Sequence, residues 1–195
     1  DTQSGSAPCG PGAGRFSRRT HYSDGLLAGL PVDATAIHAC LAARFPGAIG
    51  PLAGGADPAI AVRPADIVAV ATFLKTDPEL AFDCLSNQSG VDYPKREQIE
   101  VVFHLFSYGR RHAVVLKVGV PRDNPRLATV SAVWRTAIWQ EREIFDLLGV
   151  VFYEHPDLRR ILLPEDWFGH PLRKDFVEPE EYHGIATSRE SLLKA

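Results

Sequence analysis

The chain has 195 residues, with 21 lysines and arginines against 24 aspartates and glutamates, which gives a net charge of −3. This balance offers no reason to expect a nucleic-acid-binding surface, and no apolar run reaches the roughly 18 residues that a membrane span requires. The three cysteines, Cys9, Cys40 and Cys84, are too few and too widely spaced for a four-thiolate iron–sulfur or zinc site. We therefore expect a protein of a reducing compartment. The chain is long enough for one well-cored domain, or for one domain plus ordered arms.

The first part of the chain is expected to contain an arm, two helices and a strand. Residues 1–30 are rich in glycine, serine and proline and have few apolar anchors, which is typical of a flexible arm. The periodicity then predicts a helix over 34–45, a strand over 59–62 and a helix over 66–75. Asp33 suits the N-cap of the first helix, and Pro64 suits the first turn of the second. The glycine- and proline-rich stretch 45–58 predicts turns.

Strand-like runs rich in valine, phenylalanine and tyrosine follow. Residues 99–108 and 112–120 are separated by Gly109 and two arginines, which predicts a β-hairpin. Residues 85–93 could form a strand before it. Helix, strand, helix and then an antiparallel meander together predict an α+β domain with its helices on one face of the sheet.

A helical period returns after Thr129 and continues to Gly149, which suits the C-terminal stop, with Ser131 as a possible cap. The remaining residues are too polar and too interrupted by proline to form a core of their own. We therefore divide the chain into a flexible N-terminal arm (1–30), an α+β domain (31–150) and an extended C-terminal docking segment (151–195).

One acidic residue of this last helix is unexpected. At about 100° per residue, Glu141 falls inside the apolar stripe of the helix, beside Ile144 and Leu148. A buried carboxylate is costly unless it is hydrogen-bonded and paired. The basic residues that follow offer partners: Arg159, Arg160, Arg173 and Lys174. We therefore expect the C-terminal segment to fold over the helix through glutamate–arginine pairs. The alternative is a surface helix with ordinary solvated charges.

Two other acidic residues lie on the same helix. Asp146 is one of them: it lies four residues from Arg142, and the two side chains can pair along the side of the apolar stripe. Glu143 lies roughly opposite the stripe, where it would be solvated or offered to a partner.

A catalytic interpretation of the same residues is also open. Glu141, Glu143, Asp146, His155 and His170 could supply acid–base groups or metal ligands of a stand-alone metal-dependent hydrolase. No HExxH motif is present, however, and both histidines precede a proline in a loop. The sequence also lacks a nucleotide-binding glycine motif after a strand and a GxSxG elbow. We therefore favour a subunit whose function is shared with other chains.

The run WQEREIFDLLGVVFYEHPDLRRILLPEDWFGHPLRKDF resembles the motif of the 30 kDa-type subunit of the proton-pumping NADH:quinone oxidoreductases of respiratory complex I. The resemblance covers roughly residues 33–183. The motif residues that we expect to form a structural or interface site are Glu141, Arg142, Glu143, Asp146, His155, Pro156, Arg159, Arg160, Trp167, Gly169, Pro171, Arg173, Lys174 and Asp175.

The resemblance implies a non-catalytic structural and assembly subunit. Members of this family carry no cofactor, whereas FMN, iron–sulfur clusters and quinone belong to partner subunits. They sit in the peripheral arm, against the large subunit that lines the quinone cavity and the cluster-bearing subunits, and their C-terminal segment wraps these partners. The implied location is peripheral, on the cytoplasmic face of the bacterial inner membrane or the matrix face of the mitochondrial one. The equivalent subunit of a ferredoxin- or F420-linked dehydrogenase, or of an energy-converting hydrogenase, is the alternative within the superfamily.

Overall fold

A computed structural model describes residues 33–55 and 58–187, so the arm expected over 1–30 lies outside the described residues. The chain first forms α1 (Ala34–Arg44), β1 (Ile49–Ala53), β2 (Ala59–Val62), a 3-10 turn (Pro64–Asp66) and α2 (Ile67–Thr76). The strands β3 (Cys84–Tyr93), β4 (Gln98–Ser107) and β5 (His112–Pro121) follow, with a 3-10 turn (Pro94–Arg96) between the first two. The last elements are β6 (Arg126–Ala128), α3 (Ala137–Leu148), β7 (Val151–Tyr153), β8 (Glu181–Tyr182) and β9 (Ile185–Ala186).

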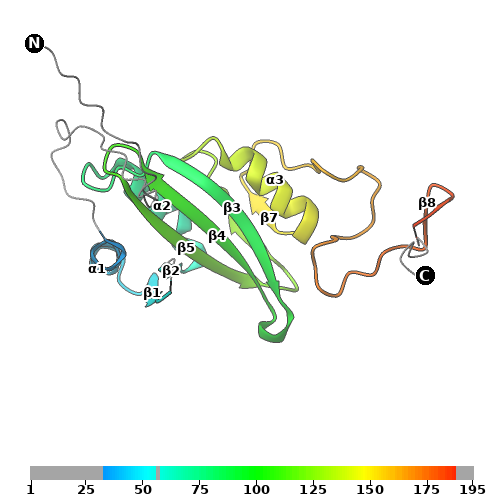
Figure 1. Cartoon of the computed structure of the whole chain (residues 1–195), viewed down its shortest axis with the longest axis horizontal. Helices are drawn as coiled ribbons and strands as arrows, with labels where there is room; N and C mark the ends of the chain where they lie inside the picture. The colour runs from blue at the N-terminus through cyan, green and yellow to red at the C-terminus, as the bar shows by residue number, and fades with distance from the viewer. Residues whose placement is uncertain (1–32, 56–57, 188–195) are drawn as a thin grey trace, which may run out of the picture.

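The centre of the domain is a five-stranded sheet in the order β1-β2-β5-β4-β3 (Figure 1). The antiparallel meander of β3, β4 and β5 confirms the predicted strands and hairpin. Two features were not predicted. β1 lies in the stretch for which we expected turns, and β2 joins the sheet parallel to β5. The short-range pattern could not indicate either, because glycines and Pro51 obscure β1 and a parallel pair joins distant segments.

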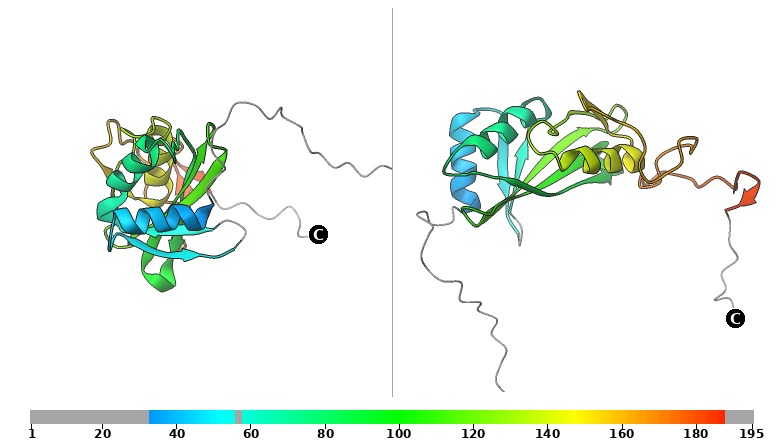
Figure 2. Two further views of the ribbon diagram at one scale, coloured as in Figure 1. Left: turned by 90° about the vertical axis from the view of Figure 1, so that its left-hand side faces the viewer. Right: turned by 90° about the horizontal axis from the view of Figure 1, so that it is seen from above.

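The core lies between one face of the sheet and the three helices. Alternate residues of β4 and β5 enter it, as period-two side-chain alternation requires, and they meet Ile37 and Leu41 of α1, Leu74 of α2, and Ile144 and Leu148 of α3. Figure 2 shows the helices on the same side of the sheet when the molecule is seen from above. The α+β class and the single helical layer are therefore as predicted.

The first two helices begin largely as predicted. The Asp33 side chain accepts a hydrogen bond from the Ala36 N–H (2.7 Å), as an N-cap should. Pro64 opens a 3-10 turn, which leads into α2 three residues later.

The prediction that α3 starts near Ser131 is wrong. The helix begins at Ala137, and the apolar residues before it form buried turns instead. Trp134 accounts for part of this difference: its indole N–H donates to the Phe82 carbonyl (2.9 Å), which anchors the turn to the core. At the other end Gly149 stops the helix in the left-handed region (φ +77°), as predicted. β6, which precedes α3 in the chain, and β7, which follows it, pair in parallel.

The chain leaves the domain after Tyr153. In Figure 1 it crosses the end of α3, shown in yellow, and then runs away from the sheet to the small β8–β9 hairpin. We call residues 154–187 the C-terminal segment. Apart from β8 and β9, this described stretch has no regular secondary structure, so side-chain contacts with the domain hold it in place.

Candidate docking site at the end of helix α3

A buried aspartate organises the start of the C-terminal segment. One carboxylate oxygen of Asp146 accepts hydrogen bonds from three consecutive backbone N–H groups, those of Ile161 (3.0 Å), Leu162 (2.8 Å) and Leu163 (2.9 Å). Its other oxygen accepts from the Arg160 guanidinium (2.7 Å). We call these five residues the Asp146 clasp. The Asp146 side chain is fully buried, so its charge is compensated inside the protein and not by water.

The electrostatics of the clasp favour the ionised carboxylate. Burial acts to raise the pKa of Asp146, but the Leu163 N–H, the Arg160 guanidinium and the N–H groups of Leu162 and Ile161 together hold that pKa below its ordinary value. The folded arrangement of the segment is therefore coupled to a negative charge at this position.

Arginine side chains fix the neighbouring backbone. Arg160 also donates to the carbonyls of Trp167 (2.8 Å) and Gly169 (3.1 Å), so one guanidinium joins α3 to two later turns. Arg142 donates to the carbonyls of Arg159 (3.1 Å) and Arg160 (3.0 Å). Our expectation that Arg142 pairs with Asp146 is therefore wrong: Arg160 takes that position because the segment folds back over the end of the helix.

A second acidic site fixes the segment further along. The side chain of Asp92, on β3, accepts hydrogen bonds from Arg122 (2.7 Å) and from the Lys174 N–H (2.8 Å). Arg122 also pairs with Asp175, and the Arg122 guanidinium holds the pKa of Asp92 below its ordinary value. The Arg173 guanidinium donates to the Leu148 carbonyl at the C-terminal end of α3 (2.8 Å), where a cation is favoured.

Glu141 is buried as its place in the apolar stripe predicted, but its partners are not arginines. One carboxylate oxygen accepts from the Val130 N–H (2.9 Å), and the other lies 2.5 Å from the Thr129 hydroxyl. No arginine among the described residues donates to it, and the nearest cationic candidate, His155 Nε2, is 3.9 Å away. The prediction of a Glu141–arginine pair is wrong.

The environment of Glu141 favours its protonated form. Desolvation raises the pKa of Glu141 to about 7, against the hydrogen bonds from Thr129 and Val130, which act to lower it. The Thr129 hydroxyl also lies 2.8 Å from that of Ser131, so a protonated Glu141 can donate to Thr129, which in turn donates to Ser131. Glu141 thus belongs to a buried polar cluster inside the domain, and this environment shifts its carboxyl group toward the neutral form.

The two histidines considered as metal ligands form local hydrogen bonds. His155 accepts from the Asp157 N–H (3.0 Å) through Nδ1, which leaves Nε2 to donate to the Ile138 carbonyl (3.1 Å). His170 Nδ1 donates to the Asp146 carbonyl (2.9 Å), and burial lowers the pKa of His170. Within residues 33–55 and 58–187, no group of three or more histidine, cysteine, aspartate or glutamate side chains is placed to hold a metal ion.

The remaining motif residues lie along the segment or on the outer face of α3. Glu143 is exposed, as its position opposite the stripe predicted. Arg159 is exposed and pairs with its neighbour Asp157 (3.1 Å). Gly169 adopts a left-handed conformation (φ +84°), and a Cβ there would lie 2.8 Å from Phe176, so glycine is required at this turn. Pro156 follows His155 in the turn after β7, and Pro171 follows His170 beside α3.

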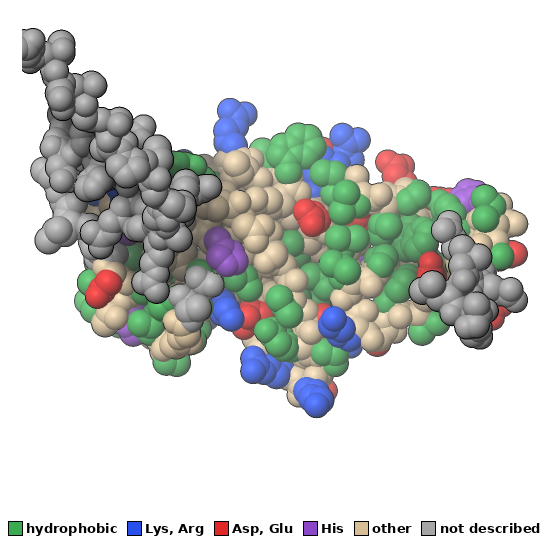
Figure 3. Space-filling model, viewed as in Figure 1, with side chains coloured by type: hydrophobic (Ala, Val, Ile, Leu, Met, Phe, Trp, Pro, Cys, Tyr) green, Lys and Arg blue, Asp and Glu red, His purple; other side chains and the backbone are tan. Residues whose placement is uncertain are grey.

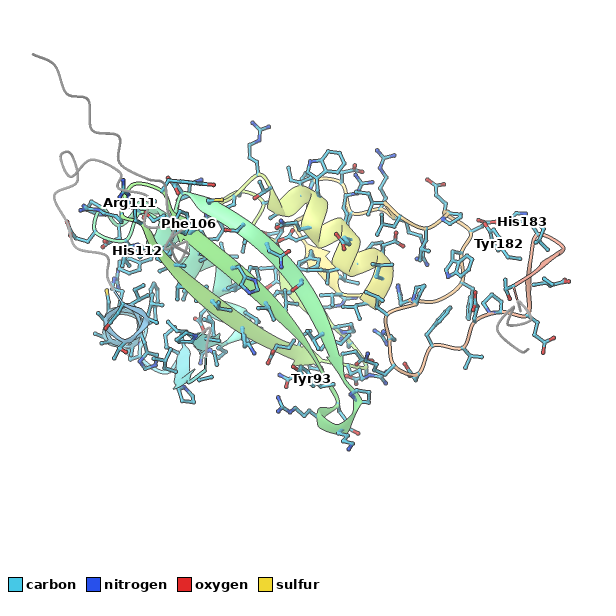
Figure 4. The ribbon with its side chains drawn as sticks, viewed as in Figure 1. Tyr93, Phe106, Arg111, His112, Tyr182 and His183 are labelled. Carbon is cyan, nitrogen blue, oxygen red and sulfur yellow. The ribbon has the colours of Figure 1, made fainter. Side chains whose placement is uncertain are left out.

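A further contact orders the far end of the segment. The Trp167 ring packs against Tyr182 (5.1 Å between centroids). Tyr182 and His183, labelled in Figure 4 on the β8–β9 hairpin, both hydrogen-bond the Asp166 carboxylate (2.7 Å each). The hairpin is thus joined to an earlier turn of the same segment.

The polar contacts face inward, and large apolar side chains face outward. Phe168 is 89% exposed and Val177 is 84% exposed, and Leu162, Leu172 and Ile185 are also exposed. Figure 3 shows apolar side chains gathered over this part of the molecule. Contiguous apolar surface held in one shape is typical of a protein–protein interface.

Sequence reasoning missed three residues of this site: Asp92, Arg122 and Thr129. Asp92 is a buried residue of the largely polar strand β3, in which no apolar alternation indicates which side chains face inward. Arg122 and Thr129 lie in stretches that carry no motif.

The fold and site thus define an α+β domain that fixes an irregular segment, which exposes apolar side chains, through buried carboxylates. The model of the family described as "Respiratory-chain NADH dehydrogenase, 30 Kd subunit" matches residues 60–182. The corresponding NADH-quinone oxidoreductase subunit of Roseiflexus castenholzii is 48% identical over 148 residues, which are 75% of this chain and 85% of that protein. Its counterpart in Herpetosiphon aurantiacus is 40% identical over 157 residues, 80% of this chain and 90% of that protein. The chain belongs to this 30 kDa subunit family.

Solved structures agree with the fold. A trypsin-resistant fragment of Nqo5 is 30% identical, with a TM-score of 0.53, and the match covers 62% of this chain and 96% of that one. A chain of the membrane-bound sulfane sulfur reductase, an archaeal respiratory complex, has a TM-score of 0.62 at 24% identity, covering 73% of this chain and 85% of that one. This second likeness concerns the fold alone. Within the described residues, no helix is both long and apolar enough to cross a membrane.

Proposed function

We propose that the chain is a structural subunit of the peripheral arm of an NADH:quinone oxidoreductase, and that its C-terminal segment docks on neighbouring subunits. FMN, the iron–sulfur clusters and the quinone site would belong to those neighbours, chiefly the large quinone-cavity subunit and the cluster-bearing subunits beside it. The chain would lie peripherally, on the cytoplasmic face of a bacterial inner membrane or the matrix face of a mitochondrial one. Family membership supports this role, and one observation of the structure carries it.

That observation is the opposite orientation of polar and apolar groups in the C-terminal segment. Asp146, Arg160 and Arg142 fix its backbone from the inside, while Phe168 and Val177 face outward. Burying large apolar side chains stabilises a protein by roughly 1.5–3 kcal/mol each, and exposed ones lack this stabilisation. A partner that covers them would recover that free energy, and the fixed backbone lowers the entropic cost of binding.

The motif residues would then act mainly from within the chain. A buried ion pair adds little net stability compared with an apolar pair of the same size, but it can specify one arrangement over others. The Asp146 clasp selects one path for Ile161–Leu163. We infer that the charged motif sets the geometry of docking and that the apolar side chains supply most of its binding free energy.

A substitution at Phe168 tests the proposal. Phe168→Asp changes a side chain that is 89% exposed, so the isolated chain should fold normally, whereas a carboxylate in an apolar interface should strongly reduce the amount of assembled complex. Native gels and NADH:quinone turnover per assembled complex give the two readouts. Tyr108→Asp is the matched control, because Tyr108 is also exposed (69%) but lies in the β4–β5 turn. Normal assembly with abolished turnover would contradict a docking role.

A further inference from the structure

The two edges of the central sheet differ in how they are protected against pairing with another strand. β1, at one edge, has five residues, contains Pro51 and has an irregular register between Ile49 and Leu52. These features commonly prevent strand addition. β3, at the other edge, has ten residues without lysine or proline. Its one irregularity lies between Leu85 and Asn87, and the rest pairs regularly with β4.

Most of the β3 edge is open in the described part of the chain. The C-terminal segment meets this strand near its end, where the Lys174 N–H donates to Asp92. Residues 87–91 have β4 on one side, and no described strand pairs with them on the other. Backbone groups on that side are therefore available to another strand.

Helix α3 provides a surface beside this open edge. Gly90 lies against the helix so closely that a Cβ there would be 2.3 Å from the Leu148 side chain. A small groove of about 80 Å³ runs between the strand and the helix, lined by Gln88, Ser89, Gly90, Glu143, Ile144, Leu147, Leu148 and Leu172. A strand added next to β3 would thus contact α3 with the side chains of one of its faces, as β3 does.

The helix side of the groove is apolar through Ile144, Leu147 and Leu148, whereas Gln88 and Ser89 line the strand side. At the rim Glu143 is exposed, and no ion pair of Glu143 is found within the described residues. Glu143 and Leu147 are four residues apart, so they lie on the same side of α3. Leu172 is 54% exposed and belongs to the C-terminal segment, so the groove is continuous with the apolar docking surface. An added strand would therefore need apolar side chains toward Leu147 and a basic side chain toward Glu143.

We propose that β3 receives a strand from a partner subunit, which extends the sheet and places a lysine or arginine against Glu143. This inference rests on the proposed function, because the partner is a subunit of the same complex. Strand addition gives affinity through backbone hydrogen bonds and specificity through alternate side chains. The C-terminal segment and the β3 edge would then contact partner subunits on two sides of α3. Two contacts on different sides would allow only one docked orientation of the chain.

The first experiment compares the purified complex with the free full-length chain by hydrogen exchange. Strand addition should slow exchange of the outward amides of residues 87–91 by roughly tenfold or more in the complex. A photo-crosslinking amino acid at Ser89 and then at Val91 should capture partner residues that differ by two positions, since both strands have a two-residue repeat. The control probe replaces Val68 on α2, which has the same exposure as Val91 (37%) and should capture no strand.

The second experiment changes the charge at the groove. Glu143→Lys should lower the amount of assembled complex by roughly tenfold through like-charge repulsion. Glu97→Lys, a charge reversal at another exposed glutamate, on the β3–β4 turn, should leave it unchanged. If Glu143→Lys and Glu97→Lys assemble equally well, the charge complementarity is refuted.

Three outcomes would overturn the proposal, and they separate it from the proposed function. Protection of the C-terminal segment in the complex, with exchange in β3 unchanged, refutes strand addition and leaves the docking role standing. Absence of the chain from the purified complex refutes both. Concentration-dependent protection of β3 in the free chain, accompanied by dimerisation, would identify a second copy as the occupant and contradict a partner subunit.

Discussion

Helix α3 carries two buried carboxylates that behave in opposite ways, Glu141 in its second turn and Asp146 in its last. Glu141 and Asp146 are five residues apart on the same helix, and both side chains are fully buried. Glu141 faces hydroxyl groups and one N–H in the domain, and desolvation raises its pKa to about 7. Asp146 faces a guanidinium and three N–H groups, and its pKa is held below the ordinary value although burial acts to raise it.

The balance between desolvation and hydrogen bonding therefore sets the charge: desolvation prevails at Glu141, whereas the guanidinium and three N–H groups prevail at Asp146. Glu141, whose carboxyl group is shifted toward the neutral form, belongs to the interior of the domain. The charged carboxylate belongs to the junction between the domain and the C-terminal segment, where a permanent charge can orient incoming N–H groups. Substitutions at one carboxylate at a time test this difference.

The largest effect is expected at the charged end. Asp146→Ala leaves a largely buried guanidinium and three N–H groups without their acceptor, which should lower the free energy of unfolding by about 3–5 kcal/mol. Urea denaturation measures it. Asp157→Ala removes a half-exposed carboxylate from the same segment and should change the free energy by less than about 1 kcal/mol. Similar losses in both variants would contradict the distinction.

Glu141 should instead make stability depend on pH. Below its unfolded pKa of about 4.5 the group is protonated in both states and gives its full contribution. As pH rises toward about 7, the unfolded chain releases the proton before the folded protein does, so stability falls and then levels off. Between pH 5 and pH 8 this amounts to about 2–3 kcal/mol.

Two glutamine substitutions check this dependence by urea unfolding. Glu141→Gln cannot ionise, so between pH 5 and pH 8 it should gain about 2–3 kcal/mol relative to the parent chain. Glu143→Gln, two residues away but exposed, should show the same pH dependence as the parent. An unchanged pH profile in Glu141→Gln would show that Glu141 is ionised throughout.

A smaller effect is expected at the C-terminal stop of α3, where the helix meets the segment. Gly149 has φ +77°, and a Cβ there would lie 2.6 Å from His170 Nε2. Gly149→Ala should therefore cost about 1–3 kcal/mol in thermal or chemical unfolding. Gly109→Ala meets no atom within 4 Å and should change stability by less than about 1 kcal/mol. Equal stability of the two variants would mean that the end of α3 relaxes freely.

The sequence was sufficient for the elements whose signals are local. The Asp33 cap, the hairpin of β4 and β5, and the Gly149 stop follow from neighbouring residues, and the structure confirms them. Glu141 was correctly placed in the apolar stripe. Its partner was not, because the helical period was predicted to return directly after Thr129, with Ser131 as a possible cap.

That assignment had a direct geometric consequence. In a continuous helix Thr129 would lie about 18 Å along the axis from Glu141, whereas the buried turn brings the two within 2.5 Å. The Asp92–Lys174 contact joins residues 82 positions apart, and no periodicity indicates such a pair. The charged motif residues of the site were thus predictable, but Asp92 and Arg122, which lie outside the motif, and the pairing of the charges were not.

Two adjacent arginines offer the sharpest test of the Asp146 clasp. Arg160 is mostly buried against Asp146, whereas the Arg159 side chain is 65% exposed. Hydrogen exchange of the full-length chain should show that Arg160→Ala speeds exchange at the N–H groups of Ile161–Leu163 by at least about tenfold, while Arg159→Ala leaves it unchanged. If these three amides stay equally protected in both variants, the Asp146 clasp does not fix the C-terminal segment.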